Sequence, residues 1–152
     1  MTVERIYTRT VPGGPTIEHE RVQVTAGAGI VGDRYYDKHD ERGQNITFIE
    51  AEEIEAFLTE HGRPYDLSLT GRNIVTRGVR LNELVGREFT VGDVRFRGVV
   101  LCEPCLGLGR ALKSEELSPA HVVKRLVHRA GLRADALVSG EIVVGAWFHN
   151  AT

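Results

Sequence analysis

The sequence predicts a mostly β protein with a few helices, in which an antiparallel, barrel-like sheet carries the helices on its outside. Segments with strand patterns outnumber segments with helical patterns. The strand segments do not alternate regularly with helices, which argues against a parallel α/β sheet. A chain of 152 residues is the size of one domain, and we expect a single domain over residues 1–152.

Composition and charge exclude several classes of protein. Hydrophobic residues make up 41% and charged residues 26%, close to the globular average, so neither disorder nor a membrane span is expected. The 19 basic and 21 acidic residues are spread along the chain without a basic stripe, which argues against nucleic acid as a partner. The first ten residues lack the continuous apolar core of a signal peptide, so we expect a cytoplasmic protein.

The N-terminal region reads as a hairpin followed by a glycine-rich turn. Residues 3–9 and 17–24 mix β-branched and charged side chains around a Pro-Gly-Gly-Pro turn, which predicts two strands. Gly27, Gly29 and Gly32 then match the G-x-G-x-x-G pattern of dinucleotide-binding folds. No apolar helical stripe follows them, and the next residue is an acid that would repel phosphate. We therefore interpret this match as accidental.

The middle of the chain predicts a buried strand at 45–50, followed by an amphipathic helix at 51–61 that ends at Gly62. From Ile74 the pattern becomes strand-like again. Two strand segments flank Gly92-Asp93, a dipeptide typical of a two-residue hairpin turn, and the second runs on into the cysteines.

The last third predicts one more helix and one more hairpin. Ser118 and Pro119 begin a helix that we expect to continue to Gly131. Its expected buried face consists of Val122, Val123, Leu126, Val127 and Ala130. A hairpin around Ser139-Gly140 is expected to end the chain, with Trp147 and Phe148 filling one end of the core.

Both cysteines lie in one C-x-x-C motif, Cys102 and Cys105. A disulfide across so small a loop would stabilise little. Zinc needs four ligands, and the nearby His121 and His128 lie seven positions apart on the predicted helix, about 10 Å along its axis. A thioredoxin-like motif should open a helix early in a βαβ unit, whereas this pair comes late in a β-rich chain. That both cysteines are simply small buried residues without a chemical role remains an open alternative.

A resemblance to a known family favours a chemical role for the cysteine pair over a purely structural one. The runs GRNIVTRGVRLNELVGREFTVGDVRFRGVVLCEPC (71–105) and VKRLVHRAGLRADALVSGEIVVG (123–145) closely resemble the MOSC domain, named after the C-terminal domain of molybdenum cofactor sulfurases. The stretches GIVGDRYY and QNITFIEAEEIEAF agree with the same family. The resemblance extends from about Gly29 to Gly145. It implies a β-rich, barrel-like fold and a role in molybdenum-cofactor or sulfur chemistry.

The resemblance also implies which cysteine is functional. In relatives that hold the cofactor, the second cysteine of the motif binds molybdenum, and here that residue is Cys105. For other members a persulfide on the same cysteine has been proposed. Both roles need a thiolate, which is a nucleophile and a soft metal ligand, so Cys105 is the expected catalytic and metal-binding residue.

Cofactor and partners follow from the same family. The resemblance implies the molybdenum cofactor. Pyridoxal phosphate belongs to a separate domain of longer relatives, and no stretch here indicates a lysine for its Schiff base. A carrier would need a sulfur donor such as a cysteine desulfurase. A reductase of this type would need an electron-donating partner, because no iron–sulfur or flavin motif is visible.

Other residues of the family's motifs carry polar groups suited to a pterin or its phosphate. Arg72 and Asn73 stand at the family's Arg/Asn-Ile-Val segment, and Thr76 follows at strand spacing. A surface ion pair for Arg72 and a turn for Asn73 are the plain structural alternatives.

Three further cationic residues complete the predicted binding set. Arg34 matches the family's Asp-Arg pair, although an ion pair with a neighbouring aspartate would also explain it. His128 and Arg133 would bring positive charge toward the cysteines, although cations are also common at helix C-termini. Tyr35 stands where the family often has histidine, which leaves that position without an assigned role.

The two thiols are expected to differ. Cys102 follows an apolar strand and shares a face with Val100, which predicts a buried and inert thiol. Pro104 bends the chain and turns Cys105 toward a pocket, where Arg110, His128, Arg133 or the backbone of residues 106–109 would favour its thiolate. A non-catalytic module that binds a small anion or a protein remains the rival hypothesis, and it requires no accessible thiol.

Overall fold

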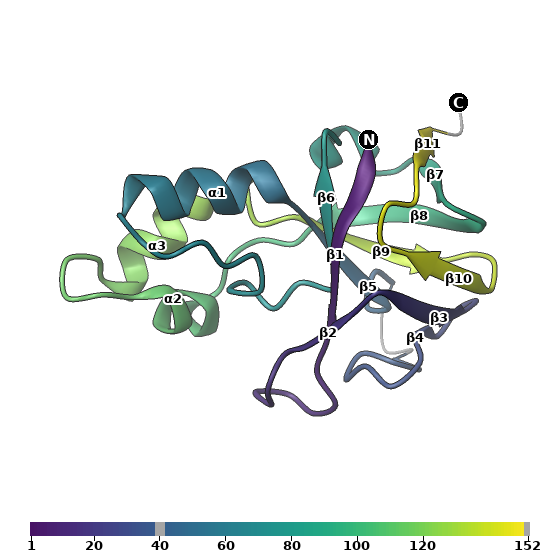
Figure 1. Cartoon of the computed structure of the whole chain (residues 1–152), viewed down its shortest axis with the longest axis horizontal. Helices are drawn as coiled ribbons and strands as arrows, with labels where there is room; N and C mark the ends of the chain where they lie inside the picture. The colour runs from purple at the N-terminus through teal and green to yellow at the C-terminus, as the bar shows by residue number, and fades with distance from the viewer. Residues whose placement is uncertain (39–41, 151–152) are drawn as a thin grey trace.

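The computed structural model describes residues 1–38 and 42–150 and shows a mostly β fold with three α-helices. An eight-stranded sheet curls into a half-barrel, and a three-stranded sheet accompanies it, while the helices gather at one end of the molecule (Figure 1). The predicted fold class is confirmed. No helix in the described ranges is long and apolar enough to cross a membrane.

The elements follow one another along the chain in an irregular order. The larger sheet has the order β11-β7-β8-β9-β5-β6-β1-β2 and contains β1 (Thr2–Thr8), β2 (Ile17–His19), β5 (Ile46–Glu50), β6 (Ile74–Arg77), β7 (Glu88–Val91), β8 (Val94–Leu101), β9 (Leu132–Ala136) and β11 (Phe148–Asn150). The smaller sheet has the order β10-β3-β4 and contains β3 (Arg21–Thr25), β4 (Gly29–Ile30) and β10 (Gly140–Val143). The helices are α1 (Ala51–Glu60), α2 (Leu106–Leu112), α3 (Pro119–Leu126) and the 3-10 turn η1 (Leu81–Leu84).

The sheet is antiparallel except where β5 and β6 pair in parallel, and α1 lies in the connection between those two strands. The predicted strand at 45–50, the helix after it and the hairpin at Gly92-Asp93 are all confirmed. Gly27, Gly29 and Gly32 have positive φ, with Gly27 and Gly32 in turns and Gly29 at the start of β4, and residues 33–37 form turns and a bend. As expected, no helix follows these glycines within the described residues 33–38.

The predicted N-terminal hairpin is confirmed in part, and the predicted C-terminal hairpin was wrong, because some of the strand pairing is non-local. Residues 17–24 do not form one strand: β2 pairs with β1, and after Glu20 the chain enters β3, which pairs with β10. The predicted hairpin around Ser139-Gly140 is absent, because β9 lies in the large sheet and β10 in the small one. Phe148 is buried as expected, but Trp147 is 62% exposed.

The helices after the cysteines also differ from prediction. Residues 106–109, expected as a glycine-rich bend, begin helix α2. Helix α3 begins as predicted, with the Ser118 side chain accepting a hydrogen bond from the His121 N–H, but it ends at Leu126 rather than near Gly131. Val127 is extended and exposed, so it does not belong to the predicted buried face.

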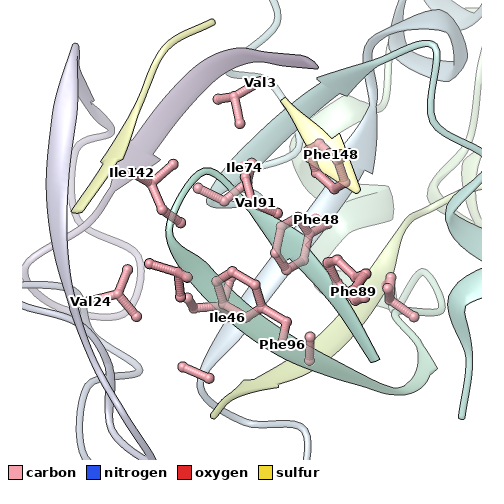
Figure 2. Packing of buried hydrophobic residues seen from close by; sticks show 14 of the residues in the cluster. Val3, Val24, Ile46, Phe48, Ile74, Phe89, Val91, Phe96, Ile142 and Phe148 are labelled. Atoms are coloured by element: carbon pink, nitrogen blue, oxygen red, sulfur yellow. The ribbon is translucent and has the colours of Figure 1, made fainter. Parts of the chain in front are cut away.

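The inside of the barrel is filled by aromatic rings. Phe48 on β5 lies at the centre, with ring centroids 5.5 Å from Phe89, 5.2 Å from Phe96 and 6.1 Å from Phe148 (Figure 2). All three contacts are edge-to-face, the arrangement that aromatic quadrupoles favour.

A second core lies outside the barrel wall, beneath the helices. Ile49 and Val75 point from β5 and β6 into a cluster with Phe57 of α1, Leu112 of α2 and Leu126 of α3. Strand β5 is thus covered on both faces, which explains why four successive residues of it, including Thr47, are buried rather than alternating with exposed ones. We call α1, α2 and α3 together the helical lobe.

Candidate functional site

The cysteine motif lies where strand β8 leaves the barrel and enters the helical lobe. Cys102 is 3% exposed, and its N–H donates to the Gly131 carbonyl at 2.8 Å. Cys105 is exposed at the start of α2. The expected difference in burial between the two thiols is confirmed.

Helix α2 places backbone donors beside the Cys105 thiol. The Leu108 N–H is the largest influence and lowers the pKa of Cys105 below its ordinary value, whereas partial burial acts in the opposite direction. The Gly107 N–H and the positive charge of Arg72 lower the pKa further. Cys105 is thus an accessible thiol whose environment favours the thiolate.

Arg72 connects this thiol to the rest of the site. Its Nε donates to the Ala130 carbonyl at 3.0 Å and its Nη2 to the Cys102 carbonyl at 3.4 Å. These bonds fix the guanidinium between the cysteine loop and the segment that enters β9. Arg72 therefore lies on the cysteine side of the site, bonded to carbonyls rather than held as a surface ion pair.

Asn73 and Thr76 are fully buried, with their side chains bonded to the protein. The Asn73 side-chain oxygen accepts from the Thr47 N–H at 3.1 Å and its hydroxyl at 3.0 Å, while its Nδ2 donates to the Tyr7 carbonyl at 3.1 Å. The Thr76 hydroxyl donates to the Ile49 carbonyl at 3.3 Å. Their roles as cofactor ligands stay predictions. The observed hydrogen bonds of Asn73 and Thr76 connect β1, β5 and β6.

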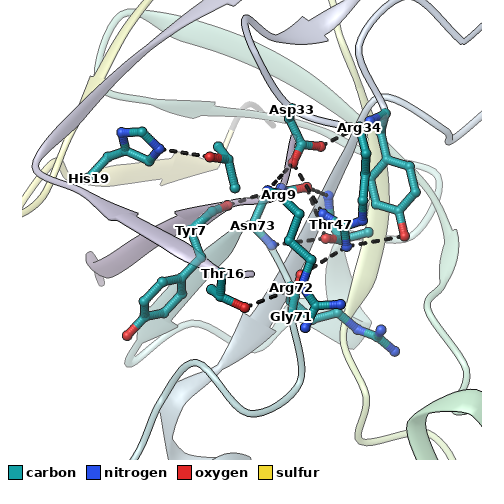
Figure 3. Close-up of polar contacts among 12 residues, drawn as sticks. Tyr7, Arg9, Thr16, His19, Asp33, Arg34, Thr47, Gly71, Arg72 and Asn73 are labelled. Carbon is teal, nitrogen blue, oxygen red and sulfur yellow. Dashed lines mark hydrogen bonds and ion pairs between the residues drawn. The ribbon is translucent and has the colours of Figure 1, made fainter. Parts of the chain in front are cut away.

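Arg34 forms the ion pair that the sequence offered as its alternative explanation. Its Nη1 lies 3.1 Å from Asp33 Oδ1, and its Nη2 donates to the Gly71 carbonyl at 3.1 Å and the Tyr35 hydroxyl at 3.3 Å (Figure 3). The guanidinium also stacks on the Tyr35 ring, 4.1 Å from its centroid. These contacts bring Arg34 next to the residue that precedes Arg72.

Arg9 belongs to the same group, and the sequence analysis missed it. Its backbone N–H donates to Asp33 Oδ1 at 3.1 Å and its Nε to the Thr16 hydroxyl at 3.2 Å. The end of its guanidinium lies against Gly71, where an added Cβ would come 2.8 Å from Nη2. No local pattern marks Arg9, because its contacts join segments that are far apart in the sequence.

A pocket of about 270 Å³ adjoins these residues. It is lined by Tyr35, Lys38, Gly43, Gln44, Thr47 and Arg133. Arg133 and Lys38 give this pocket two basic side chains, and the binding role of Arg133 stays a prediction. Cys105 is not among the described residues that line this pocket, so Arg133 and the thiol do not share it.

His128 is engaged elsewhere. Its φ of 62° places it beyond the end of α3, and its Nδ1 lies 3.2 Å from a Glu103 carboxylate oxygen. The other Glu103 oxygen accepts from the His128 N–H at 2.8 Å. Within residues 1–38 and 42–150 no group of three or more His, Cys, Asp and Glu side chains could hold a metal ion.

These features define a class of protein: a barrel-like β fold with an accessible cysteine at the start of helix α2, and with an arginine, Arg72, whose charge acts on that thiol. A family model for the MOSC domain matches residues 35–147, about three quarters of the chain, so this protein belongs to the MOSC domain family. The family recognition made from the sequence is confirmed. The matched range contains Cys105, Arg72 and Arg133 but excludes Arg9 and Arg34.

Solved structures agree on the fold. The YuaD protein from Bacillus subtilis superposes with a TM-score of 0.84 at 18% identity, over 99% of this chain and 96% of that one. YiiM from Geobacillus stearothermophilus gives 0.73 at 15% identity, over 99% and 75%. YiiM from Escherichia coli gives 0.70 at 15% identity, over 100% and 70%. At such identities the likeness establishes the fold alone, and a search of curated proteins finds no match.

Proposed function

We propose that this protein uses the Cys105 thiolate either to bind the molybdenum of a molybdenum cofactor or to carry sulfane sulfur. The observation that carries the proposal is the environment of Cys105: an exposed thiol with backbone donors at Leu108 and Gly107 and the charge of Arg72 nearby. A thiolate is the form that both roles require.

The residues present fit an anionic cofactor. A pterin with a phosphate group needs fixed cationic donors. Arg72, whose charge acts on the thiol, and Arg34, which bonds to the carbonyl of the preceding Gly71, supply two guanidinium groups. Arg133 and Lys38 add positive charge to the adjoining pocket of about 270 Å³. In this proposal Asn73 and Thr76 hold β6, the strand that follows Arg72, rather than touching the cofactor.

The two versions of the proposal assign Cys105 different tasks. When bound, the molybdenum cofactor would supply the redox chemistry, with Cys105 as its protein ligand, and an electron-donating reductase would be the partner. In the carrier version, the Cys105 thiolate attacks the outer sulfur of a cysteine desulfurase's persulfide. A sulfur–sulfur bond forms on Cys105 while the donor's bond breaks, and the donor thiolate leaves. Either version needs a reducing compartment, so a cytoplasmic location is part of the proposal.

The test measures both kinds of loading in protein made by a host that synthesises the molybdenum cofactor. Molybdenum is measured by mass spectrometry and sulfane sulfur by cyanolysis, in the wild type and in Cys105→Ser and Cys102→Ser. We expect Cys105→Ser to abolish loading with the fold intact, and Cys102→Ser to keep most of it. Equal loss in both variants would indicate a cooperating cysteine pair, and absence of both molybdenum and labile sulfur from the wild type would overturn the proposal.

A further inference from the structure

Three arginines from distant parts of the chain meet at one glycine. Arg9 comes from the end of the β1–β2 hairpin, Arg34 from the turn after β4, and Arg72 from the segment before β6 (Figure 3). Arg34 donates to the Gly71 carbonyl at 3.1 Å, and Arg9 lies against the face of Gly71 where a Cβ would be. We call Arg9, Arg34 and Arg72 the arginine cluster.

The charge of the arginine cluster is not balanced by the groups described around it. The carboxylate in direct contact is Asp33, whose side chain is fully buried and paired with Arg34 at 3.1 Å. Three cations and one carboxylate leave two positive charges in a partly buried setting, where charges interact more strongly than in water. Burial, followed by the charge of Arg34, holds the pKa of Arg9 below its ordinary value, and Arg72 contributes in the same direction.

The unused donors of the cluster belong mainly to Arg9. Arg34 spends both of its terminal nitrogens on Asp33, Tyr35 and Gly71, and Arg72 spends Nε and Nη2 on carbonyls. Arg9 uses Nε for Thr16, while its two terminal nitrogens have no acceptor among the residues that the structure describes. A guanidinium left with two parallel donors matches two oxygens of one oxyanion.

The position of Arg9 is set by hydrogen bonds to two neighbouring side chains. Its N–H is held by Asp33 and its Nε by Thr16, so the guanidinium is fixed at both ends of its stem. Gly71 has a φ of +68°, which suits glycine, and its lack of a side chain leaves room for Nη2. Fixed donors lose little freedom on binding, which favours affinity for a small anion.

We infer that Arg9 completes, with Arg34 and Arg72, a site for a tetrahedral oxyanion of the phosphate type. The inference deepens the proposed function and rests on it for the site's use next to Cys105. The oxyanion has two sources, the phosphate group of a bound cofactor or a free anion, and both present the same oxygens to the cluster. Arg9 lies outside the matched family range, so this contribution comes from the chain's own N-terminal hairpin.

The experiment titrates inorganic phosphate into the Cys105→Ser protein by calorimetry and by amide chemical shifts. Removing the thiol separates anion binding from molybdenum and sulfur loading, so this inference and the proposed function fail independently. Loss of a charge-assisted contact predicts that Arg9→Ala weakens phosphate binding by about tenfold or more. Arg9→Lys keeps the charge but not the paired donors. Its affinity for phosphate is expected to lie between those of the parent protein and Arg9→Ala.

Two matched variants complete the design. Arg21→Ala removes an exposed arginine that pairs with Glu141 on the small sheet, and it should leave phosphate binding unchanged. Gly71→Ala should weaken binding because its methyl group displaces the Arg9 guanidinium. Unchanged binding in Arg9→Ala, an equal loss in Arg21→Ala, or no phosphate binding in the parent protein would overturn the inference.

A second arm identifies the source of the oxyanion. Wild-type protein loaded with cofactor is titrated beside unloaded protein. If the cofactor's phosphate occupies the cluster, loaded protein no longer takes up free phosphate. If loaded protein still binds phosphate in an Arg9-dependent way, the occupant is a free oxyanion.

Discussion

At the scale of single residues, the difference between the two cysteines comes from where the strand ends. Cys102 is still held by the Gly131 carbonyl at the end of β8, which keeps its thiol inside. Three residues later the chain turns into α2, and Cys105 faces solvent beside the first N–H groups of that helix. Strand alternation and Pro104 were enough to predict this difference from sequence.

The depressed pKa of Cys105 predicts its alkylation profile. In native protein the rate of Cys105 modification by iodoacetamide should reach half its maximum at a pH below the ordinary thiol pKa of about 8.5, because the thiolate is the reactive form. Cys102 should react only after unfolding. Peptide mass spectrometry across pH measures both.

Two charge substitutions test whether Arg72 contributes to the lowered pKa of Cys105. Arg72→Met should move the Cys105 profile to higher pH, whereas Arg110→Met, on the exposed side of α2, should not. A native profile centred at or above the ordinary thiol pKa would show that the helix donors do not act on this thiol.

Asn73 gives the second prediction at this scale. Asn73→Ala removes the acceptor of the Thr47 N–H and the donor to the Tyr7 carbonyl, and leaves both buried groups unpaired. The free energy of unfolding should fall by about 2–4 kcal/mol, measured by urea denaturation. The control Asn82→Ala, which loses an exposed bond to the His128 carbonyl, should cost well under half as much. Near-equal losses would contradict the fastening role of Asn73.

At the scale of elements, local signals were predictable and packing-dependent ones were not. The β7–β8 hairpin follows from its own turn dipeptide. Helix α2 was missed because Gly107 and Gly109 lower helix propensity, and the reason for Gly109 is tertiary. A Cβ at Gly109 would come 2.5 Å from the Pro119 carbonyl of α3, so glycine lets the two helices touch.

This contact predicts opposite outcomes for two glycines of α2. Gly109→Ala should destabilise the protein despite better helix propensity, because its methyl group pushes α3 away from α2. Gly107→Ala meets only the Cys105 sulfur at 3.5 Å and should be neutral or slightly stabilising. Thermal unfolding followed by circular dichroism measures both. A stabilising Gly109→Ala would show that the helices can separate without cost.

The site was only partly predictable for the same reason. Arg72 and Arg34 were found through motifs, but the pairing that brings Arg9 to them depends on the β1–β2 hairpin and on Asp33, 24 residues away in sequence. Asn73 and Thr76 were recognised as important polar residues, but sequence spacing alone could not reveal that the strands use them internally.

At the scale of the whole molecule, strand β5 joins two cores. Phe48 faces the aromatic interior of the barrel, and its neighbour Ile49 faces the helical lobe. The arginine cluster is held by segments of the sheet, whereas Cys105 stands on the lobe at the start of α2. The proposed chemistry therefore needs both cores to keep their relative positions. Arg72, just before β6, bonds to the Cys102 carbonyl of the cysteine loop and to the Ala130 carbonyl.

The last prediction compares the two cores. Leu112→Ala empties a buried position of the helical lobe and should cost about 2–5 kcal/mol locally. Because the lobe rests on one side of the sheet, we expect amide hydrogen exchange to quicken in α2 and α3 while β5, β8 and β9 stay protected. Phe48→Ala, at the centre of the aromatic cluster, should reduce protection throughout. If Leu112→Ala lowers protection of the sheet and the lobe equally, the two cores unfold as one unit, and Cys105 cannot move independently of the arginines behind it.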